Sequence, residues 1–291
     1  MKKKWLTRNL VVISLVSLMQ DAASELMYPL MPLFLTGVLV APAIVLGAIE
    51  GTAEVAMGVS KYFAGRASDS RGRKPFITAG YSLAGVGKVL VASAQVWSMV
   101  LFGRVIDRIG KGIRSAPRDA MITDSVSPEQ YARAFGFHRS ADTLGAVIGP
   151  ILALVGLSLL DGDVRAVMWW AVIPAVLSIG LTFLIKENRS HAKRNITKVK
   201  KLSPDKIQLP RKFWVTATPF ILFALVNVPD SLLLLRIYQI GTSTTNVVLA
   251  YIAFNLVYTL AAYPAGILAE KIPPHRIYAL GLSAFALSYL A

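Results

Sequence analysis

The sequence predicts an all-α protein that crosses a membrane several times. Of its 291 residues, 55% are hydrophobic and 16% are charged, whereas soluble chains carry about 25% charged residues. The apolar residues gather in stretches near the length of about 20 residues that a membrane helix needs. The net charge of +15 lies mostly in short segments between these stretches. That placement is typical of the positive-inside rule and argues against nucleic-acid binding.

Eight spans and the start of a ninth are predicted. They cover residues 10–35, 43–63, 75–94, 98–116, 133–158, 166–185, 213–237 and 247–268, followed by an apolar stretch from 277 to 291 that is short of a full crossing. The opening residues 1–18 are similar to a signal peptide. Because the apolar run resumes after Glu25, we interpret them as an uncleaved first helix.

The basic residues predict the orientation in a cell membrane. They stand before the first span and after each even-numbered span, as Lys74 and Lys271 do. The opposite loops, 36–42, 95–97 and 161–165, contain one basic residue in total. The N-terminus and the loops that leave even-numbered helices are therefore expected in the cytoplasm.

A polar, Lys-rich stretch divides the chain. Residues 186–212 have no apolar periodicity, and no aromatic residue stands among their lysines. We interpret them as a cytoplasmic linker. The predicted domains are a six-helix bundle over 1–185 and an incomplete second bundle over 213–291.

The span at 98–116 carries an unusual row of charges. The row contains Arg104, Asp107, Lys111, Arg114 and Arg118, spaced by three, four, three and four residues. This spacing places all five on one helix face, provided that the helix continues through Pro117. A charge in hydrocarbon costs about 2.5 to 3.5 kcal/mol on insertion scales. The row must therefore face the protein interior or a water-filled cavity, unless the whole segment is an amphipathic helix in the cytoplasm.

Two short segments repeat each other. Gly65 and Asp69 in the segment after the second span correspond to Gly266 and Glu270 after the eighth. Each segment reads glycine, three residues, an acid and then bases, which include Arg73 and Lys74 in the first copy and Lys271 and Arg276 in the second. A parallel repeat of this size is typical of a transporter built from two bundles.

The first of these segments resembles the loop signature of the major facilitator superfamily, Gly-x-x-x-Asp-Arg/Lys-x-Gly-Arg-Arg/Lys, with Ser70 in place of the first base. The resemblance implies two six-helix bundles that alternate access to a central cavity. It also implies a conformational latch on the cytoplasmic side, made by Gly65, Asp69, Gly72 and Arg73. In the fourth span, Arg104 and Gly110 resemble the ends of the family pattern Arg-x-x-Gln-Gly-x-Gly, with Asp107 and Arg108 in place of its Gln and the following Gly.

The fifth span resembles one branch of that family. Gly145, Gly149 and Pro150 match the Gly-x-x-x-Gly-Pro motif of drug/proton antiporters, although Ala153 and Leu154 replace its last two glycines. Two glycines four residues apart allow another helix to approach closely, and the proline permits a bend.

Ionisable residues inside the predicted spans are the candidate functional groups. The candidates for proton coupling and translocation are Asp21, Glu25, Glu50, Glu54, Arg104, Asp107, Lys111 and Asp142. For Glu50, Glu54 and Lys88, permanent ion pairs that fix the helix packing remain an equal alternative. For Asp21, Glu25 and Arg104 we favour function, since the first and fourth helices line the cavity in the resembled fold.

These observations predict a transporter that exports a small organic solute in exchange for protons. A carboxylate in a low-dielectric cavity can take up a proton near neutral pH. An uptake symporter would use the same groups. An intramembrane transferase, suggested by residues 161–166, is disfavoured because no further Asp follows between 168 and 184. The expected partners are a small-molecule substrate, protons and the lipid bilayer. With no Cys and three scattered His, neither a metal nor a cofactor is expected.

Overall fold

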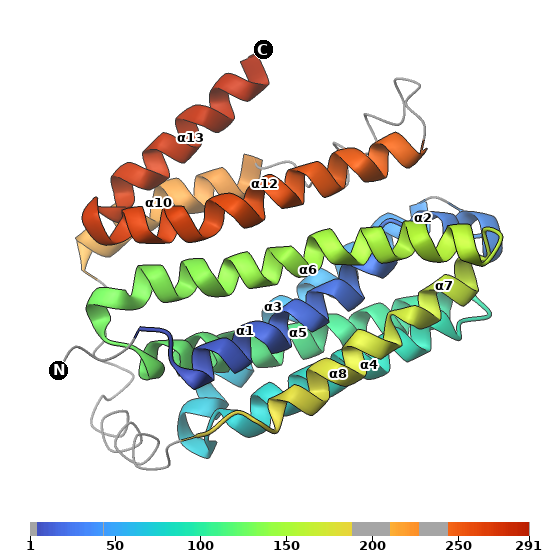
Figure 1. Ribbon diagram of the computed structural model, residues 1–291, viewed down its shortest axis with the longest axis horizontal. Coiled ribbons are helices and arrows are strands. Elements are labelled where there is room, and N and C mark those ends of the chain that lie inside the picture. The colour runs from blue at the N-terminus through green and yellow to red at the C-terminus, as the bar shows by residue number, and fades with distance from the viewer. Residues whose placement is uncertain (1–4, 43, 188–209, 227–243, 291) are drawn as a thin grey trace. The chain divides into compact units, whose positions relative to one another are not determined.

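The computed structural model describes residues 5–42, 44–187, 210–226 and 244–290. The regular elements in these ranges are all helical, which confirms the predicted class. They are α1 (Arg8–Met27), α2 (Met31–Leu33), the π-helical turn η1 (Phe34–Val38), α3 (Ile44–Arg71), α4 (Lys74–Ala92), α5 (Trp97–Ser125), the 3-10 turn η2 (Pro128–Gln130), α6 (Tyr131–Leu159), α7 (Val164–Trp170), α8 (Val172–Thr182), α10 (Arg211–Val226), α12 (Thr244–Lys271) and α13 (Pro274–Leu290) (Figure 1).

The chain separates into two compact units. The first comprises Met1–Glu187 with Ile252–Ala291, and the second comprises Asn188–Tyr251. Within the first unit, α1 packs against α6 and α8, while α5 packs against both α3 and α4. The long helices of residues 8–159 run side by side in Figure 1. In the second unit the described elements are α10, which contains Pro219, and the first turns of α12.

Five of the described helical segments are long and apolar enough to cross a membrane. They are Arg8–Met27, Lys74–Ala92, Pro128–Leu159, Val164–Thr182 and Val248–Lys271. The helices α3 and α5 do not meet this criterion, although both are longer than most of the others. Their sequences hold too many charged residues for a hydropathy average to recognise them as spans.

Prolines explain where two predicted helices are interrupted. The predicted span 10–35 is one helix only as far as Met27, and a short helix and a π-helical turn follow. The predicted span 166–185 is divided at Ala171 into α7 and α8. Proline lacks the N–H that would bond to the carbonyl four residues earlier, and its ring clashes with that carbonyl. Pro32 stands five residues after Met27, the last residue of α1, and Pro174 stands four residues after Trp170, the last residue of α7.

The helix α5 is longer than predicted. It continues through Pro117 and ends at Ser125, so the row of charges from Arg104 to Arg118 lies on one helix. The predicted span 213–237 corresponds to α10, and its residues after Val226 lie outside the described ranges. The last helix begins at Pro274, three residues earlier than predicted, in agreement with the preference of proline for the first helical position.

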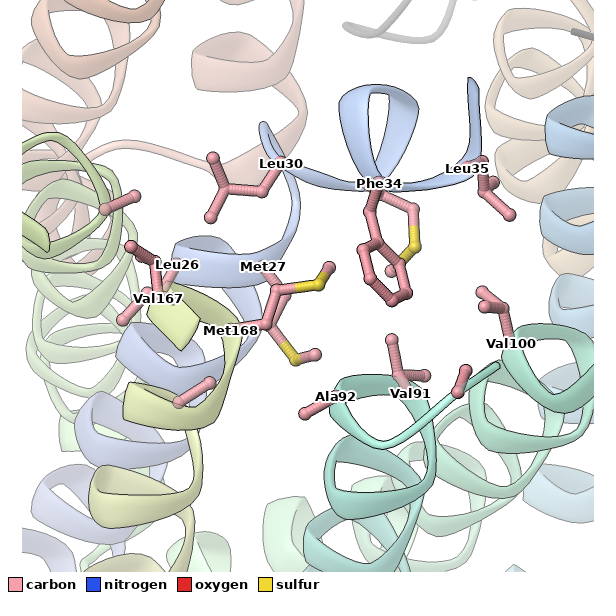
Figure 2. Packing of buried hydrophobic residues seen from close by; sticks show 14 of the residues in the cluster. Leu26, Met27, Leu30, Phe34, Leu35, Val91, Ala92, Val100, Val167 and Met168 are labelled. Atoms are coloured by element: carbon pink, nitrogen blue, oxygen red, sulfur yellow. The ribbon is translucent and has the colours of Figure 1, made fainter. Parts of the chain in front are cut away.

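Two apolar clusters close opposite ends of the first bundle. At one end, Met27, Phe34 and Met168 point into the space beside Val91 and Ala92 at the end of α4 (Figure 2). At the other end, the cluster joins the first turns of α1 and α4 to the last turns of α5. Along α4 and α5, Lys88, Arg104 and Asp107 lie between residues of the two clusters.

The glycine motif of the fifth span lies against α1. A Cβ atom on Gly145 would collide with the backbone oxygen of Leu18, and one on Gly149 would lie 2.6 Å from the oxygen of Ala22. Pro150 follows inside α6 without ending that helix. The two helices therefore approach to backbone contact at these glycines.

We predict that Gly145→Ala lowers the stability of the protein. The added methyl group has no space, and overpacking of this kind costs about 1 to 3 kcal/mol. The matched control is Gly180→Ala in α8, where a Cβ would meet nothing within 4 Å and alanine favours the helix by about 0.5 to 1 kcal/mol. Thermal unfolding in detergent should show a lower Tm for the first variant only. Equal Tm values for both variants would contradict the close α1–α6 packing.

Candidate functional site

Six charged side chains from three helices form a cluster that we call the α3–α5 charge cluster. Its members are Glu50 and Glu54 of α3, Lys88 of α4, and Arg104, Asp107 and Arg108 of α5. Three acids face three bases, so the cluster is neutral as a whole. Neutrality allows α5 to lie among apolar helices, since an unpaired charge there would be far more costly than a paired one.

The centre of the cluster is Asp107, which is 7% exposed. Its Oδ1 accepts a hydrogen bond of 2.9 Å from Nζ of Lys88, and its Oδ2 lies 3.6 Å from a guanidinium nitrogen of Arg104. Lys88 is itself only 2% exposed. This pair links α4 to α5 at a depth where neither partner has access to solvent.

The outer side of the cluster joins α5 to α3. Arg104 donates to Oε1 of Glu50 from Nη2 at 2.5 Å and from Nε at 3.0 Å. Arg108 lies 3.6 Å from the other oxygen of Glu50 and 3.4 Å from Oε1 of Glu54. Both glutamates, for which the sequence left ion pairing open, are thus in ion pairs with α5.

A small cavity adjoins this cluster. It is lined by Ser24, Met27, Met31, Gly87, Lys88, Val91, Arg104 and Asp107. Its walls come from the end of α1 and from the facing sides of α4 and α5. The cavity therefore places the Lys88–Asp107 pair next to the helix that carries Asp21 and Glu25.

A second polar group, which we call the α1–α6 network, lies between α1, α5 and α6. Asp142 accepts a 2.5 Å hydrogen bond from the hydroxyl of Ser17 and a 3.1 Å bond from Arg139. Arg118 of α5 donates to the same Ser17 hydroxyl at 3.2 Å. Ser14 lies 3.3 Å from Nδ1 of His138. Ser14 and Ser17 were not among the predicted site residues, although they stand seven and four residues before Asp21, which places all three on one helix face.

The two acids of α1 lie at the level of the α6 glycines. A Cβ atom on Gly145 would be 3.1 Å from the Cβ of Asp21, and one on Gly149 would be 2.8 Å from the carbonyl carbon of Glu25. The side chain of Asp21 makes no hydrogen bond or ion pair with the residues described. The charges that act on it are those of Asp142, Lys111, Glu25 and Arg114.

The remaining cations of the α5 row differ in their surroundings. Lys111 is exposed. Arg114 is 3% exposed, and its guanidinium lies 4.3 Å above the ring of Tyr81. Its Nε and Nη1 atoms are buried without a hydrogen-bond partner among the described residues. A cation over an aromatic face is attracted by the ring quadrupole, which partly replaces an anion. Sequence spacing could not have identified Tyr81 as this partner.

The loop signature holds α3, α4 and α5 together at their common end. Gly72 ends α3 with a φ of +94°, a conformation that glycine adopts without strain. Next to it, Arg73 donates to the carbonyl of Ala120 at 2.7 Å and pairs with Asp124. Gly65 faces Ala116, since its Cβ would lie 3.4 Å from that side chain. Asp69 is exposed and has no ion pair within the described ranges.

The second copy of the repeat makes a different contact. Glu270 accepts a 3.2 Å hydrogen bond from the backbone N–H of Arg133 and lies 2.8 Å from its guanidinium. Arg133 stands in the first turn of α6, where the helix dipole also favours an acid. In this copy of the repeat, the acid therefore contacts the N-terminal turn of another helix.

No three His, Asp or Glu side chains in the described ranges are grouped as ligands for a metal ion. The site thus consists of charged and hydroxyl groups on α1, α3, α4, α5 and α6. Such groups can bind polar solutes, exchange protons and rearrange their pairing.

Comparisons with known proteins agree with this architecture. A family model described as Major Facilitator Superfamily matches residues 13–291. The chain is 27% identical over 283 residues to the uncharacterised MFS-type transporter MJ1317 of Methanocaldococcus jannaschii, a match that covers 95% of this chain and 70% of that protein. It is also 27% identical over 138 residues to the multidrug resistance protein MdtH of Yersinia enterocolitica, covering 47% of this chain and 34% of that protein.

Solved structures show the same fold. A D-xylose-proton symporter has a TM-score of 0.66 at 17% identity, and the match covers 96% of this chain and 73% of that chain. The human organic anion transporter MFSD10 (TETRAN) has a TM-score of 0.52 at 21% identity, covering 61% and 47%. The chain spans about a third of the MdtH protein and about half of MFSD10.

We predict that breaking the Lys88–Asp107 pair from one side is costly. Lys88→Met removes the hydrogen-bonded cation of Asp107 and leaves that acid buried. Removing one partner of a buried ion pair lowers the free energy of unfolding by about 3 to 5 kcal/mol. The double variant Lys88→Met/Asp107→Leu removes both charges and should recover a large part of the loss. Chemical denaturation of four proteins, the parent, Lys88→Met, Asp107→Leu and the double variant, would measure this coupling. A double variant whose loss equals the sum of the two single losses would show that the pair is not coupled.

Proposed function

This chain belongs to the Major Facilitator Superfamily, and from that premise we propose that it is a secondary active transporter that exports a small organic solute in exchange for protons. The transport would follow alternating access, in which the central site opens to one side of the membrane at a time. The cytoplasmic N-terminus, the bundle at 1–185, the linker at 186–212 and the second bundle at 213–291 are parts of this proposal.

The proposal of proton coupling rests on the absence of a basic partner within 4 Å of the Asp21 carboxylate among the described residues. The acids of the α3–α5 charge cluster and Asp142 each have a basic partner within 4 Å. Asp21 has no such partner among the described residues, although it lies in the middle of α1 and beside α6. An acid without a committed partner can gain and lose a proton without dismantling the helix packing. Asp21 is therefore our candidate for the proton site, with Glu25 one turn further along the same face.

The other candidate residues would balance or transmit the charge of Asp21. Lys111 and Arg114 would balance its charge when it is ionised. Arg104 and Asp107 would act as a charge relay, because Asp107 lines the cavity that reaches α1 at Ser24. Protonation of Asp21 would change the balance of these groups and so favour one state of the carrier over the other.

Export is favoured over uptake by the antiporter-like motif of α6. Gly145, Gly149 and Pro150 match that motif and bring α1 into backbone contact with α6. The likeness to a protein named for multidrug resistance points the same way. The alternative is a proton-coupled uptake symporter that uses the same charges. The direction in which protons move with the solute separates the two.

The loop signature is proposed as the conformational latch. Arg73 and Gly72 hold the ends of α3, α4 and α5, and Gly65 keeps α3 close to α5. Asp69 is exposed and available to bind a partner group when the carrier changes state.

We predict that Asp21→Asn abolishes proton movement evoked by substrate. Inverted membrane vesicles would be tested with a panel of quaternary ammonium compounds and aromatic carboxylates while lumenal pH is recorded. The variant keeps the size of the side chain but cannot bind a proton. Glu25→Gln would be measured beside it. The matched control is Asp161→Asn, an exposed residue with a φ of +49° that asparagine also tolerates. Normal proton movement in the Asp21 variant would refute its coupling role.

We predict that Asp69→Asn impairs transport without lowering stability. The side chain is exposed and has no ion pair within the described ranges, so its replacement should change the free energy of unfolding by less than about 0.5 kcal/mol. If Asp69 belongs to the latch, the transport rate should still fall several-fold. Tm and transport would be measured on the same preparation. Unchanged transport would remove Asp69 from the latch.

A further inference from the structure

The contacts between α6 and residues 252–271 of α12 form what we call the α6–α12 seam. The hydroxyl of Ser140 donates to the carbonyl of Thr259 at 2.7 Å. A Cβ atom on Gly136 would lie 3.0 Å from the Cα of Gly266, so the two backbones touch. The ion pair between Arg133 and Glu270 lies at one end of the seam. If α6 and α12 move relative to each other, all three of these contacts must change at the same time.

One arginine connects this seam to the buried α1–α6 network. Nη1 of Arg139 donates to Oδ2 of Asp142 at 3.1 Å, and Nε donates to the hydroxyl of Tyr258 at 2.9 Å. Its guanidinium carbon also lies 5.0 Å from the centre of the Tyr258 ring. The side chain of Asp142 is 9% exposed, whereas that of Arg139 is 51% exposed. A single cation therefore bridges a buried acid and a residue of the opposite helix.

The charges around Asp142 come from three helices. Its own helix supplies His138 and Arg139, α1 supplies Asp21, and α5 supplies Arg118. A Cβ atom on Gly145, three residues after Asp142, would lie 3.1 Å from the Cβ of Asp21, so the α1–α6 contact brings Asp21 into the neighbourhood of Asp142 and Arg139. Arg139 is thus attracted by two acids, of which Asp142 is bound to it directly. The strength of the total attraction depends on whether Asp21 carries a proton.

We propose that Arg139 is the positioning residue that couples the charge of Asp21 and Asp142 to the α6–α12 seam through Tyr258. This inference rests on the proposed function. When Asp21 is ionised, both acids draw the guanidinium toward α1, and its bond to Tyr258 weakens. A proton on Asp21 removes one of the two attractions and leaves Arg139 bridging Asp142 and Tyr258. The seam is then closed in the protonated state and looser in the ionised state.

The seam can be followed directly because the chain has no cysteine. Nitroxide labels on Leu159→Cys of α6 and Leu260→Cys of α12, both exposed positions, report the distance between the helices by pulsed electron resonance in liposomes. We expect two distance populations whose ratio changes about ten-fold between about pH 5 and about pH 8, within the ordinary range of coupling between sites.

Three variants test the role of Arg139. In Asp21→Asn the closed population should dominate at every pH. In Arg139→Gln the ratio should no longer depend on pH, and Arg139→Lys, which keeps the charge, should restore part of the dependence. A purely structural role would change the stability but leave the pH profile in place. Arg139→Gln with the full pH dependence of the parent would falsify the proposal.

A milder variant keeps the test valid if Arg139→Gln does not fold. Tyr258→Phe retains the ring and removes only the hydroxyl that accepts from Nε, so it should reduce the pH-dependent change at least two-fold. The control is Tyr62→Phe, an exposed tyrosine on α3. An unchanged profile in Tyr258→Phe overturns the proposal.

If the parent moves protons with substrate but its seam does not respond to pH, the inference fails while the proposed function stands. If neither occurs, both fail.

Discussion

The arrangement of the first bundle depends on one constraint, which is that charges inside a low-dielectric structure must be balanced by near neighbours. The helix α5 carries Arg104, Asp107 and Arg108 within five residues. It can lie between α3 and α4 only because Glu50, Glu54 and Lys88 are presented by those helices at bonding distance. An uncompensated partner would cost several kcal/mol. The three helices therefore behave as one block whose register is set by ion pairs.

This constraint divides the acids into two kinds. Those of the α3–α5 charge cluster are held by bases and contribute to packing. Asp21 is different, because the close approach of α1 to α6 places it near Asp142 and not in an ion pair with a described base. Under the proposed function we expect the proton-exchanging acid to lack a fixed basic partner, since an acid held in an ion pair would resist a change of charge.

The sequence was a good guide to the class, to the approximate position of the helices and to the faces on which charges lie. Proline was a poor guide to helix ends. Pro32 and Pro174 follow breaks, while Pro117 and Pro150 stand inside long helices. The backbone group that a proline leaves unbonded can be tolerated where neighbouring helices pack around it. That depends on tertiary contacts, which spacing along one helix does not reveal.

The same limit applies to the site. A period of three and four residues predicts which side chains share a face, and it placed the row on α5 correctly on one helix. It does not give the register between helices. The contacts Lys88–Asp107 and Arg139–Tyr258 join residues 19 and 119 positions apart. Their partners could be found only after the helices were placed.

The glycine motif of α6 links packing to chemistry. Glycine at 145 and 149 removes the side chains that would otherwise separate α6 from α1. The positions of α1 that come closest include Asp21 and Glu25. Asp142 lies three residues before Gly145 on α6, so the motif brings acids from two helices into one neighbourhood. A methyl group at either glycine would therefore disturb the electrostatics of the acids as well as the packing. The glycines set the distance between α1 and α6, and this distance sets how strongly the acids on the two helices interact.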